Sequence, residues 1–293
     1  MADIRFVQAD TLKEKPADVS KVGFGRVFTD YMFEMDYNPE EGWHDARIVP
    51  YQDVPLSPAN ATLHYGQAIF EGCKAYRYEG GKAVVFRAKD HIARLNRSAK
   101  ILDIPEVDEK LVYDALMKLI DLEKDWIPDG PGQSLYIRPF IFSTDPYLGV
   151  SVGQYYKMMI ILSPVGAYYA NGFAPVKIMV EDTYVRAPKG GLGAAKTPAN
   201  YAASLHGGLI AHEKGYDQTL WTDGIEHKYI GEVGSMNILF KIDGKVVTPE
   251  LDGTILDGIT RRTVLRVCKE WGIPTEERRI SIDELIEDYE NGK

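Results

Sequence analysis

The sequence predicts a mixed α/β protein built from two domains. Its 293 residues exceed the usual size of one compact domain. Short runs rich in aromatic and β-branched residues are interspersed with longer segments in which apolar residues recur every three or four positions. Strand and helix do not alternate strictly, so the pattern fits an α/β or α+β architecture.

Strands are predicted where short apolar runs are bounded by Gly, Pro and Asp. Ser134–Phe142 and Tyr155–Leu162 are the clearest examples. Asp243-Gly244 separates two further runs and indicates a tight hairpin, because both residues tolerate the left-handed conformation that the turn requires.

Helices are predicted where an apolar stripe follows a capping residue. Asp90 is expected to cap one helix, with Leu95 on its buried face, and Asp108 a second helix that runs to about Glu123. A later amphipathic helix is expected to end at Gly272.

The domain boundary is predicted at residues 164–175, where S-P, G-A and N-G pairs follow one strand and precede another. This gives an N-terminal domain over residues 1–163 and a C-terminal domain over 176–293. Ligands often bind where two domains meet, so Tyr168 in this segment is a candidate pocket residue. The alternative is an exposed loop aromatic.

Composition excludes several classes of function. The net charge is −9 and no block of Lys and Arg occurs, so a nucleic-acid partner is not expected. Cys73 and Cys268 are far apart, and the six histidines lack metal-binding spacing, so no metal site is predicted. The N-terminus lacks the apolar core of a signal peptide, and no apolar run is long enough to span a bilayer. We expect a cytoplasmic protein.

The segment GGLGAAKTPANY, Gly190 to Tyr201, is the most informative in the chain. Its small residues allow a bulky group to approach the backbone near Lys196, and Thr197-Pro198 reads as the start of a helix that ends near Gly215. A lysine that forms a Schiff base must lose its proton near neutral pH, and burial together with a following helix N-terminus favours this.

Two alternatives to a Schiff-base lysine remain open. A phosphate-binding P-loop requires glycine immediately before the lysine, whereas Ala195 stands there and Pro198 removes a backbone N–H. An ordinary surface lysine in a glycine-rich loop is the other alternative.

Seven ordered motifs make the sequence resemble the branched-chain amino acid aminotransferases. They are HYG…FEG, ARLNRSAK, YIRP, PVGAY, GGLGAAKTPANY, IGEVGSMNILF and LDGITRR, and the likeness extends from about Phe24 to the chain end. The resemblance implies a two-domain fold type IV enzyme with a smaller N-terminal and a larger C-terminal domain, the latter binding pyridoxal 5'-phosphate. It also implies a homodimer with sites at the interface.

The resemblance assigns the cofactor residues. Lys196 corresponds to the catalytic lysine that carries the cofactor and shuttles the α-proton of the substrate. Glu232 corresponds to the carboxylate that pairs with the pyridine nitrogen, and Tyr201 to the phenol that bonds the ring oxygen. The remaining cofactor-binding positions are Arg94, Ile259 and Thr260 for the phosphate, with Arg186 and Ser235 nearby.

The resemblance also assigns a substrate pocket with aromatic walls. Its residues are Tyr65, Phe70, Tyr136, Arg138, Val150 and Tyr168, with Tyr65 and Val150 as candidates for donation to the partner subunit. An apolar wall suits leucine, isoleucine and valine. Arg138 is expected to receive the distal carboxylate of glutamate or 2-oxoglutarate. Core packing of the aromatics and a structural ion pair for Arg138 are the alternatives.

The sequence departs from the family pattern at its end. The family continues for several tens of residues through a Gly-Thr-Ala turn, whereas here Ser281 and Glu284 form a capping box for a helix that runs to about Glu290. We therefore expect this chain to lack the family's C-terminal segment, which leaves an inactive cofactor-binding fragment as one possibility.

Two other activities are compatible with parts of the pattern. D-amino-acid aminotransferase and aminodeoxychorismate lyase share the lysine and glutamate, but Tyr136-x-Arg138 and the PVGAY loop favour the branched-chain group. A phosphoryl-transfer P-loop enzyme is a more distant rival. The predicted reaction is reversible transamination between branched-chain L-amino acids and 2-oxoglutarate, as in branched-chain amino acid biosynthesis.

Overall fold

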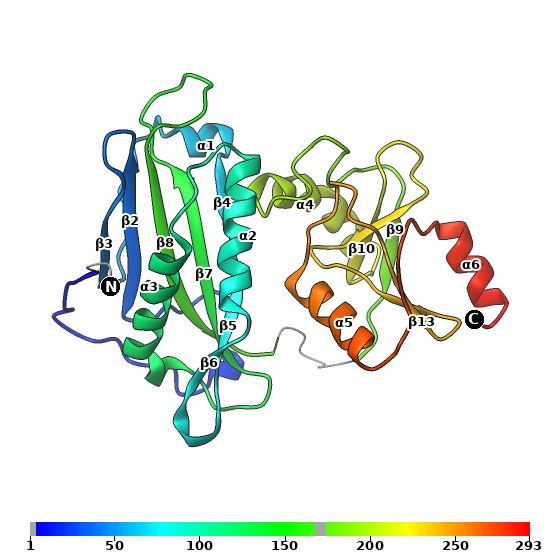
Figure 1. Cartoon of the computed structure of the whole chain (residues 1–293), viewed down its shortest axis with the longest axis horizontal. Coiled ribbons are helices and arrows are strands. Elements are labelled where there is room, and N and C mark those ends of the chain that lie inside the picture. The colour runs from blue at the N-terminus through cyan, green and yellow to red at the C-terminus, as the bar shows by residue number, and fades with distance from the viewer. Residues whose placement is uncertain (1–3, 168–173) are drawn as a thin grey trace. The chain divides into compact units, whose positions relative to one another are not determined.

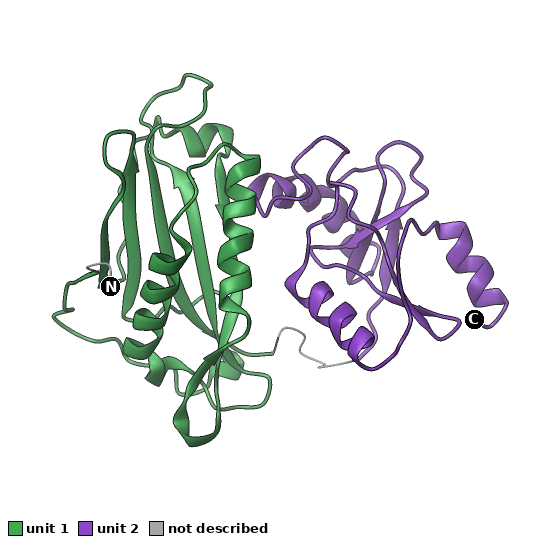
Figure 2. Cartoon of the chain, viewed as in Figure 1, with its two compact units in different colours: residues 1–173 green, residues 174–293 purple. Residues whose placement is uncertain are grey.

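The protein folds into two compact units in a computed structural model that describes residues 4–167 and 174–293 (Figure 1). Unit 1 spans Met1–Phe173 and unit 2 spans Ala174–Lys293 (Figure 2). The division lies inside the segment 164–175. Unit 1 contains one large sheet with covering helices, and unit 2 contains two small sheets.

Unit 1 is built on an eight-stranded sheet in the order β1-β3-β2-β8-β7-β5-β6, with β4 also paired to β7. The strands are β1 Arg5–Phe6, β2 Tyr31–Asn38, β3 Gly42–Pro50, β4 Ala68–Phe70, β5 Cys73–Arg77, β6 Ala83–Val85, β7 Ser134–Ser143 and β8 Tyr156–Val165. The two strands predicted from the sequence are confirmed as β7 and β8. They pair antiparallel from Ser134↔Val165 to Ser143↔Tyr156 and form the middle of the sheet.

Helices α2 and α3 pack on one face of this sheet (Figure 1). The helical segments of unit 1 are η1 Val19–Lys21, α1 Ala61–Tyr65, η2 Glu79–Gly81, α2 Ala88–Ile101, α3 Glu109–Leu122 and η3 Lys124–Trp126. Leu95 and Leu119 are fully buried in the core between helices and sheet. Each side chain of this kind contributes about 1.5–3 kcal/mol on burial.

The two helix caps predicted in unit 1 have different outcomes. Asp108 caps α3 by accepting hydrogen bonds from the amides of Lys110 and Leu111, as predicted. Asp90 does not cap α2, because the left-handed conformation of Arg87 (φ 53°) starts the helix earlier. Asp90 lies instead in the first turn, where its carboxylate pairs with Arg87 Nε at 2.8 Å.

Unit 2 contains two three-stranded sheets, ordered β11-β10-β9 and β12-β13-β14 in its described part. The strands are β9 Ile178–Glu181, β10 Gln218–Thr222, β11 Ile230–Val233, β12 Phe240–Ile242, β13 Lys245–Thr248 and β14 Thr275–Glu277. The predicted hairpin is confirmed: Asp243 and Gly244, at φ 47° and 75°, join β12 to β13. The core of this unit includes Leu220, Val247 and Ile280.

The helices of unit 2 begin and end close to the predicted positions. They are α4 Pro198–Glu213, α5 Ile259–Glu270 and α6 Ile282–Glu290. Gly272 has a φ of 69° just after α5, and Ser281 caps α6 by accepting from the Glu284 amide at 3.1 Å. Among residues 4–167 and 174–293, no helix is both long and apolar enough to cross a membrane.

A buried acidic pair lies where α3 meets β2. Glu123 is 2% exposed, and its Oε1 accepts a hydrogen bond from the Tyr31 amide at 2.5 Å. The neighbouring Asp30 accepts from Trp126 Nε1 at 2.8 Å. Burial, supported by the charge of Asp30, raises the pKa of Glu123 to about 7 against the opposing effect of the Tyr31 bond.

Replacing Glu123 with Gln should change the pH dependence of stability. A raised pKa in the folded state means that the neutral acid favours folding below about pH 4.5 and that this contribution is lost as the pH rises through about 7. As the pH rises from 5 to 8, the free energy of unfolding of Glu123→Gln should therefore increase relative to that of the wild type, by at most about 3 kcal/mol. Urea unfolding across this range measures the gain, with exposed Glu40→Gln as control. A pH-independent difference would contradict the assignment.

Candidate active site

Lys196 and Tyr201 form a close pair at the start of α4. Lys196 Nζ donates a hydrogen bond to Tyr201 Oη at 2.6 Å and lies 5.2 Å from the ring centroid. Thr197 is the N-cap and Pro198 the first helical residue, as predicted, although the Thr197 hydroxyl makes no capping bond. Because helical side chains lean toward the N-terminus, Tyr201 reaches back over the first turn to the lysine.

The glycine-rich loop before Lys196 packs tightly on the rest of unit 2. A Cβ on Gly193 would overlap the backbone of Thr254, so only glycine fits there. Asn200 Nδ2 donates to the carbonyls of Leu192 and Ala195, both at 2.8 Å. The loop is therefore held between α4 and the segment around Thr254.

Glu232 is a buried carboxylate with several donors. It lies on β11 and is 3% exposed. Its Oε2 is 2.5 Å from Nη2 of Arg186, and its Oε1 accepts from Asn237 Nδ2 at 3.0 Å and from the Leu256 amide at 3.2 Å. These donors replace water around a charge that would otherwise be costly to bury.

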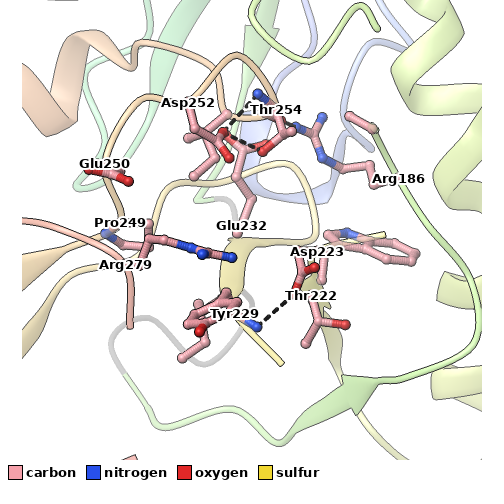
Figure 3. Close-up of a pocket in the computed structure, with 15 residues that line it drawn as sticks. Arg186, Thr222, Asp223, Tyr229, Glu232, Pro249, Glu250, Asp252, Thr254 and Arg279 are labelled. Carbon is pink, nitrogen blue, oxygen red and sulfur yellow. Dashed lines mark hydrogen bonds and ion pairs between the residues drawn. The ribbon is translucent and has the colours of Figure 1, made fainter. Parts of the chain in front are cut away.

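Arg186 connects Glu232 to the glycine-rich loop. Its Nη2 also donates to the Thr254 carbonyl at 2.9 Å, and Thr254 is the residue on which Gly193 packs (Figure 3). Arg186 thus links Glu232 to the backbone on which the glycine-rich loop packs. The resemblance assigned Arg186 to the neighbourhood of the cofactor but did not reveal its bonds to Glu232 and Thr254.

A small cavity of about 40 Å³ adjoins this carboxylate (Figure 3). Arg186, Glu232, Asp252 and Arg279 are among its lining residues, whereas Lys196 and Tyr201 do not line it. The volume suits a few water molecules and is too small for an aromatic ring. The described residues contain no group of three or more His, Cys, Asp or Glu placed to bind a metal.

The predicted phosphate residues of unit 2 lie at a helix start. Ile259 is the first residue of α5 and is buried, and Thr260 follows it and is exposed. The backbone amides at a helix N-terminus favour an anion. Ser235 lies in the exposed turn after β11, three residues beyond Glu232.

Arg94 lies in unit 1, where it is buried in an ion pair rather than exposed on the helix face. On α2 it is 5% exposed, and its Nε and Nη2 donate to the two oxygens of Glu71 at 2.6 and 2.9 Å. His91 Nδ1 lies 2.7 Å from Glu71 Oε2. Although burial raises the pKa of Glu71, hydrogen bonds from Arg94 and His91 outweigh it and hold that pKa at about 2.

Three of the predicted substrate residues form one cluster. Arg138 Nη2 donates to Tyr136 Oη at 3.0 Å, and the guanidinium carbon lies 4.5 Å from the centroid of the Phe70 ring. Tyr136 and Arg138 share a face of β7 because strand side chains alternate. Phe24, which is not among the predicted substrate residues, packs edge-on against Tyr136, with the two ring centroids 4.8 Å apart.

Tyr65 and Val150 lie at the end of α1 and in the loop between β7 and β8. The Tyr65 hydroxyl donates to the Leu148 carbonyl, which joins the end of α1 to the loop between β7 and β8. Val150 is 82% exposed on that loop. Tyr168 lies outside the described residues.

The residues that hold the expected ones in place were not evident from the sequence. Glu71 and Asn237 stand inside quoted motifs, yet only the structure shows that they bond to Arg94 and Glu232. Phe24 marks the beginning of the likeness, and an aromatic between two glycines was a signal that could have been followed.

Comparison with known proteins identifies the family. A model of class IV aminotransferases ("Amino-transferase class IV") matches residues 68–290. The chain belongs to the class IV aminotransferases, and its mixed α/β fold is that of fold type IV enzymes. This membership excludes the P-loop alternative.

The similar proteins are branched-chain aminotransferases. Branched-chain-amino-acid aminotransferase 2 of Bacillus subtilis (strain 168) is 53% identical over 289 residues, which cover 99% of this chain and 79% of that protein. The crystal structure of the Escherichia coli branched-chain amino acid aminotransferase has 31% identity and a TM-score of 0.72, covering 87% of this chain and 79% of that one. The T.th. branched-chain amino acid aminotransferase with pyridoxamine 5'-phosphate has 26% identity and a TM-score of 0.71, covering 86% and 78%.

Replacing Gly193 with Ala should loosen the glycine-rich loop. The added methyl group meets rigid backbone at Thr254, and overpacking of this kind costs about 1–3 kcal/mol. Gly208→Ala on α4 is the matched control, since nothing lies within 4 Å of the new methyl group and helix propensity improves by up to about 1 kcal/mol. Thermal unfolding compares them. A Gly193→Ala variant that melts at the same temperature as the wild type would show that the loop accommodates a side chain at Gly193.

Proposed function

We propose that this protein is a pyridoxal-phosphate-dependent aminotransferase that transfers the amino group of leucine, isoleucine and valine to 2-oxoglutarate, giving branched-chain 2-oxo acids and L-glutamate. The observation that carries the proposal is the pairing of Lys196 with Tyr201, in the same unit as a buried carboxylate, Glu232. The naming of relatives at about 53% identity as branched-chain aminotransferases supports the substrate class.

The residues of unit 2 fit the chemistry of pyridoxal phosphate. An amine, a phenol, a buried carboxylate and a helix N-terminus are the groups needed for its aldehyde, ring hydroxyl, ring nitrogen and phosphate. Class IV aminotransferases depend on this cofactor. Gly193 lets the loop that leads to Lys196 pack directly on the Thr254 backbone.

Lys196 is the proposed catalytic residue. The cofactor, when bound, supplies an aldehyde that condenses with amines and a ring that accepts electrons. Lys196 Nζ would hold the cofactor at its aldehyde, and would move a proton to and from the substrate Cα. Tyr201 Oη, 2.6 Å from this nitrogen, orients the amine and would bond the ring hydroxyl.

Glu232 is proposed to hold a proton on the ring nitrogen. A charged carboxylate beside that nitrogen stabilises its protonated form, which makes the ring a better electron acceptor. Arg186 keeps the carboxylate in place and itself bonds to the Thr254 carbonyl. The start of α5 at Ile259 and Thr260, with Arg94, is proposed to bind the phosphate; Ser235 is a further proposed contact.

Phe70, Tyr136 and Arg138 are proposed to surround the substrate side chain. Phe70 and Tyr136 offer apolar area for leucine, and Arg138, held by the Tyr136 hydroxyl, receives the distal carboxylate of glutamate. We further propose a homodimer in which Tyr65 and Val150 contribute to the partner's pocket. Tyr168, outside the described residues, remains a proposed substrate residue on the strength of the resemblance alone. The enzyme is proposed to act in the cytoplasm. The exposure of Val150 supports the homodimer, and the two free buried cysteines support the location.

Lys196→Ala should abolish covalent attachment of the cofactor. Borohydride reduction of the wild type with added pyridoxal phosphate should fix one label on the peptide that contains Lys196, whereas the variant should take up none. Exposed Lys189→Ala, from the same loop, is the control and should label normally. Mass spectrometry locates the label. A label that persists at another lysine in the Lys196 variant would sink the assignment.

Arg138→Met should impair one half-reaction more than the other. Loss of a charge-assisted bond to the distal carboxylate costs about 1.5–3 kcal/mol, or roughly tenfold to a hundredfold in kcat/KM with glutamate. The leucine half-reaction should change much less, because methionine fills part of the vacated space. Stopped-flow absorbance measures both.

The Tyr136→Phe variant serves as the comparison for Arg138→Met. It keeps the charge of Arg138 but removes the hydroxyl that holds the guanidinium. Its kcat/KM with glutamate should therefore fall by less than that of Arg138→Met. A parallel fall in both half-reactions of Arg138→Met would mean that Arg138 supports the fold instead.

A further inference from the structure

Asn237 bonds to Glu232 and to the backbone segment that precedes α5. It lies between β11 and β12, five residues after Glu232. Its Nδ2 donates to Glu232 Oε1 at 3.0 Å and to the Leu256 carbonyl at 2.9 Å. One amide group therefore joins the carboxylate on β11 to the segment that leads into α5.

The other side of the Asn237 amide contacts the start of α5. Gly258 is the N-cap of this helix, and a Cβ on Gly258 would collide with Asn237 Oδ1. Ile259 and Thr260, the proposed phosphate residues, follow directly. The position of the amide thus fixes the distance between Glu232 and the helix N-terminus.

We propose that Asn237 is a positioning residue for cofactor binding, which sets Glu232 and the start of α5 at the separation that one bound pyridoxal phosphate requires. This inference rests on the proposed roles of Glu232 and α5. A ligand held through both its ring nitrogen and its phosphate binds more tightly when the protein presets the spacing of the two contacts.

The chemistry of the amide suits this position. The Nδ2 group has two hydrogens, and both are used, one on a carboxylate and one on a carbonyl. Aspartate has the same shape but lacks these donors, and its charge would repel Glu232. Arg186 holds the opposite oxygen of the carboxylate and the Leu256 amide shares Oε1, so loss of Asn237 removes one of three donors and weakens the hold on the Oε1 side.

The first experiment measures pyridoxal phosphate binding to the full chain by absorbance titration. Asn237→Ala should raise the dissociation constant about tenfold or more, and Asn237→Asp should raise it further. Thr248→Val is the matched control, because it removes a buried bond of 2.7 Å to the carbonyl of Ile238, the next residue along, without touching Glu232. Thr248→Val should lower the free energy of unfolding in urea and leave the dissociation constant unchanged.

The second experiment tests whether Asn237 acts through Glu232. Glu232→Gln removes the charge whose position matters, so adding Asn237→Ala to it should slow the single-turnover leucine half-reaction by much less than Asn237→Ala slows the wild type. An equal slowing in both backgrounds would overturn the inference, as would wild-type cofactor affinity in Asn237→Ala. A wild-type chain that binds no pyridoxal phosphate would overturn the proposed function as well.

Discussion

The ion pair between Arg186 and Glu232 is the interaction on which the rest of unit 2's site depends. It places a carboxylate inside a small sheet, where the loss of water must be offset by donors from three separate segments. Arg186 ties this charge to the backbone at Thr254, on which the glycine-rich loop packs. The loop that leads to Lys196 therefore packs on the same backbone segment to which Arg186 ties the acid.

The two units place their charged residues by the same physical means. In unit 1, Glu71 holds the guanidinium of Arg94 by both oxygens, and His91 adds a third contact. In unit 2, the carboxylate of Glu232 is the expected ligand contact and Arg186 supports it. In unit 1, Arg94 is the expected ligand contact and the carboxylate of Glu71 supports it. Burial makes each pair rigid because neither partner can leave without stranding the other's charge.

Much of the fold was predictable, because local chemistry determines it. The strands around Ser134 and Tyr156, the Asp243-Gly244 turn and the cap at Asp108 follow from side-chain alternation, turn preferences and hydrogen bonding within a few residues. Asp90 failed as a cap because the unusual conformation of Arg87 has no signature in the sequence. Motifs indicated Lys196 and Glu232. The bond from Asn237 to the Leu256 carbonyl joins residues 19 apart along the chain, so only the structure could reveal it.

The two faces of strand β7 carry residues of different kinds. Its inward residues Leu135, Ile137 and Ile141 are fully buried in the core of unit 1, whereas Tyr136 and Arg138 alternate with them on the opposite face. The face that carries Tyr136 and Arg138 also carries Phe140 and Phe142, which pack in a separate hydrophobic cluster with Met159. Under the proposed function, exchanging Tyr136 or Arg138 changes which substrate is recognised and leaves the core on the other face in place. The pleat of a single strand thus lets substrate preference diverge at these two positions, in evolution or by design, apart from the positions on which folding depends.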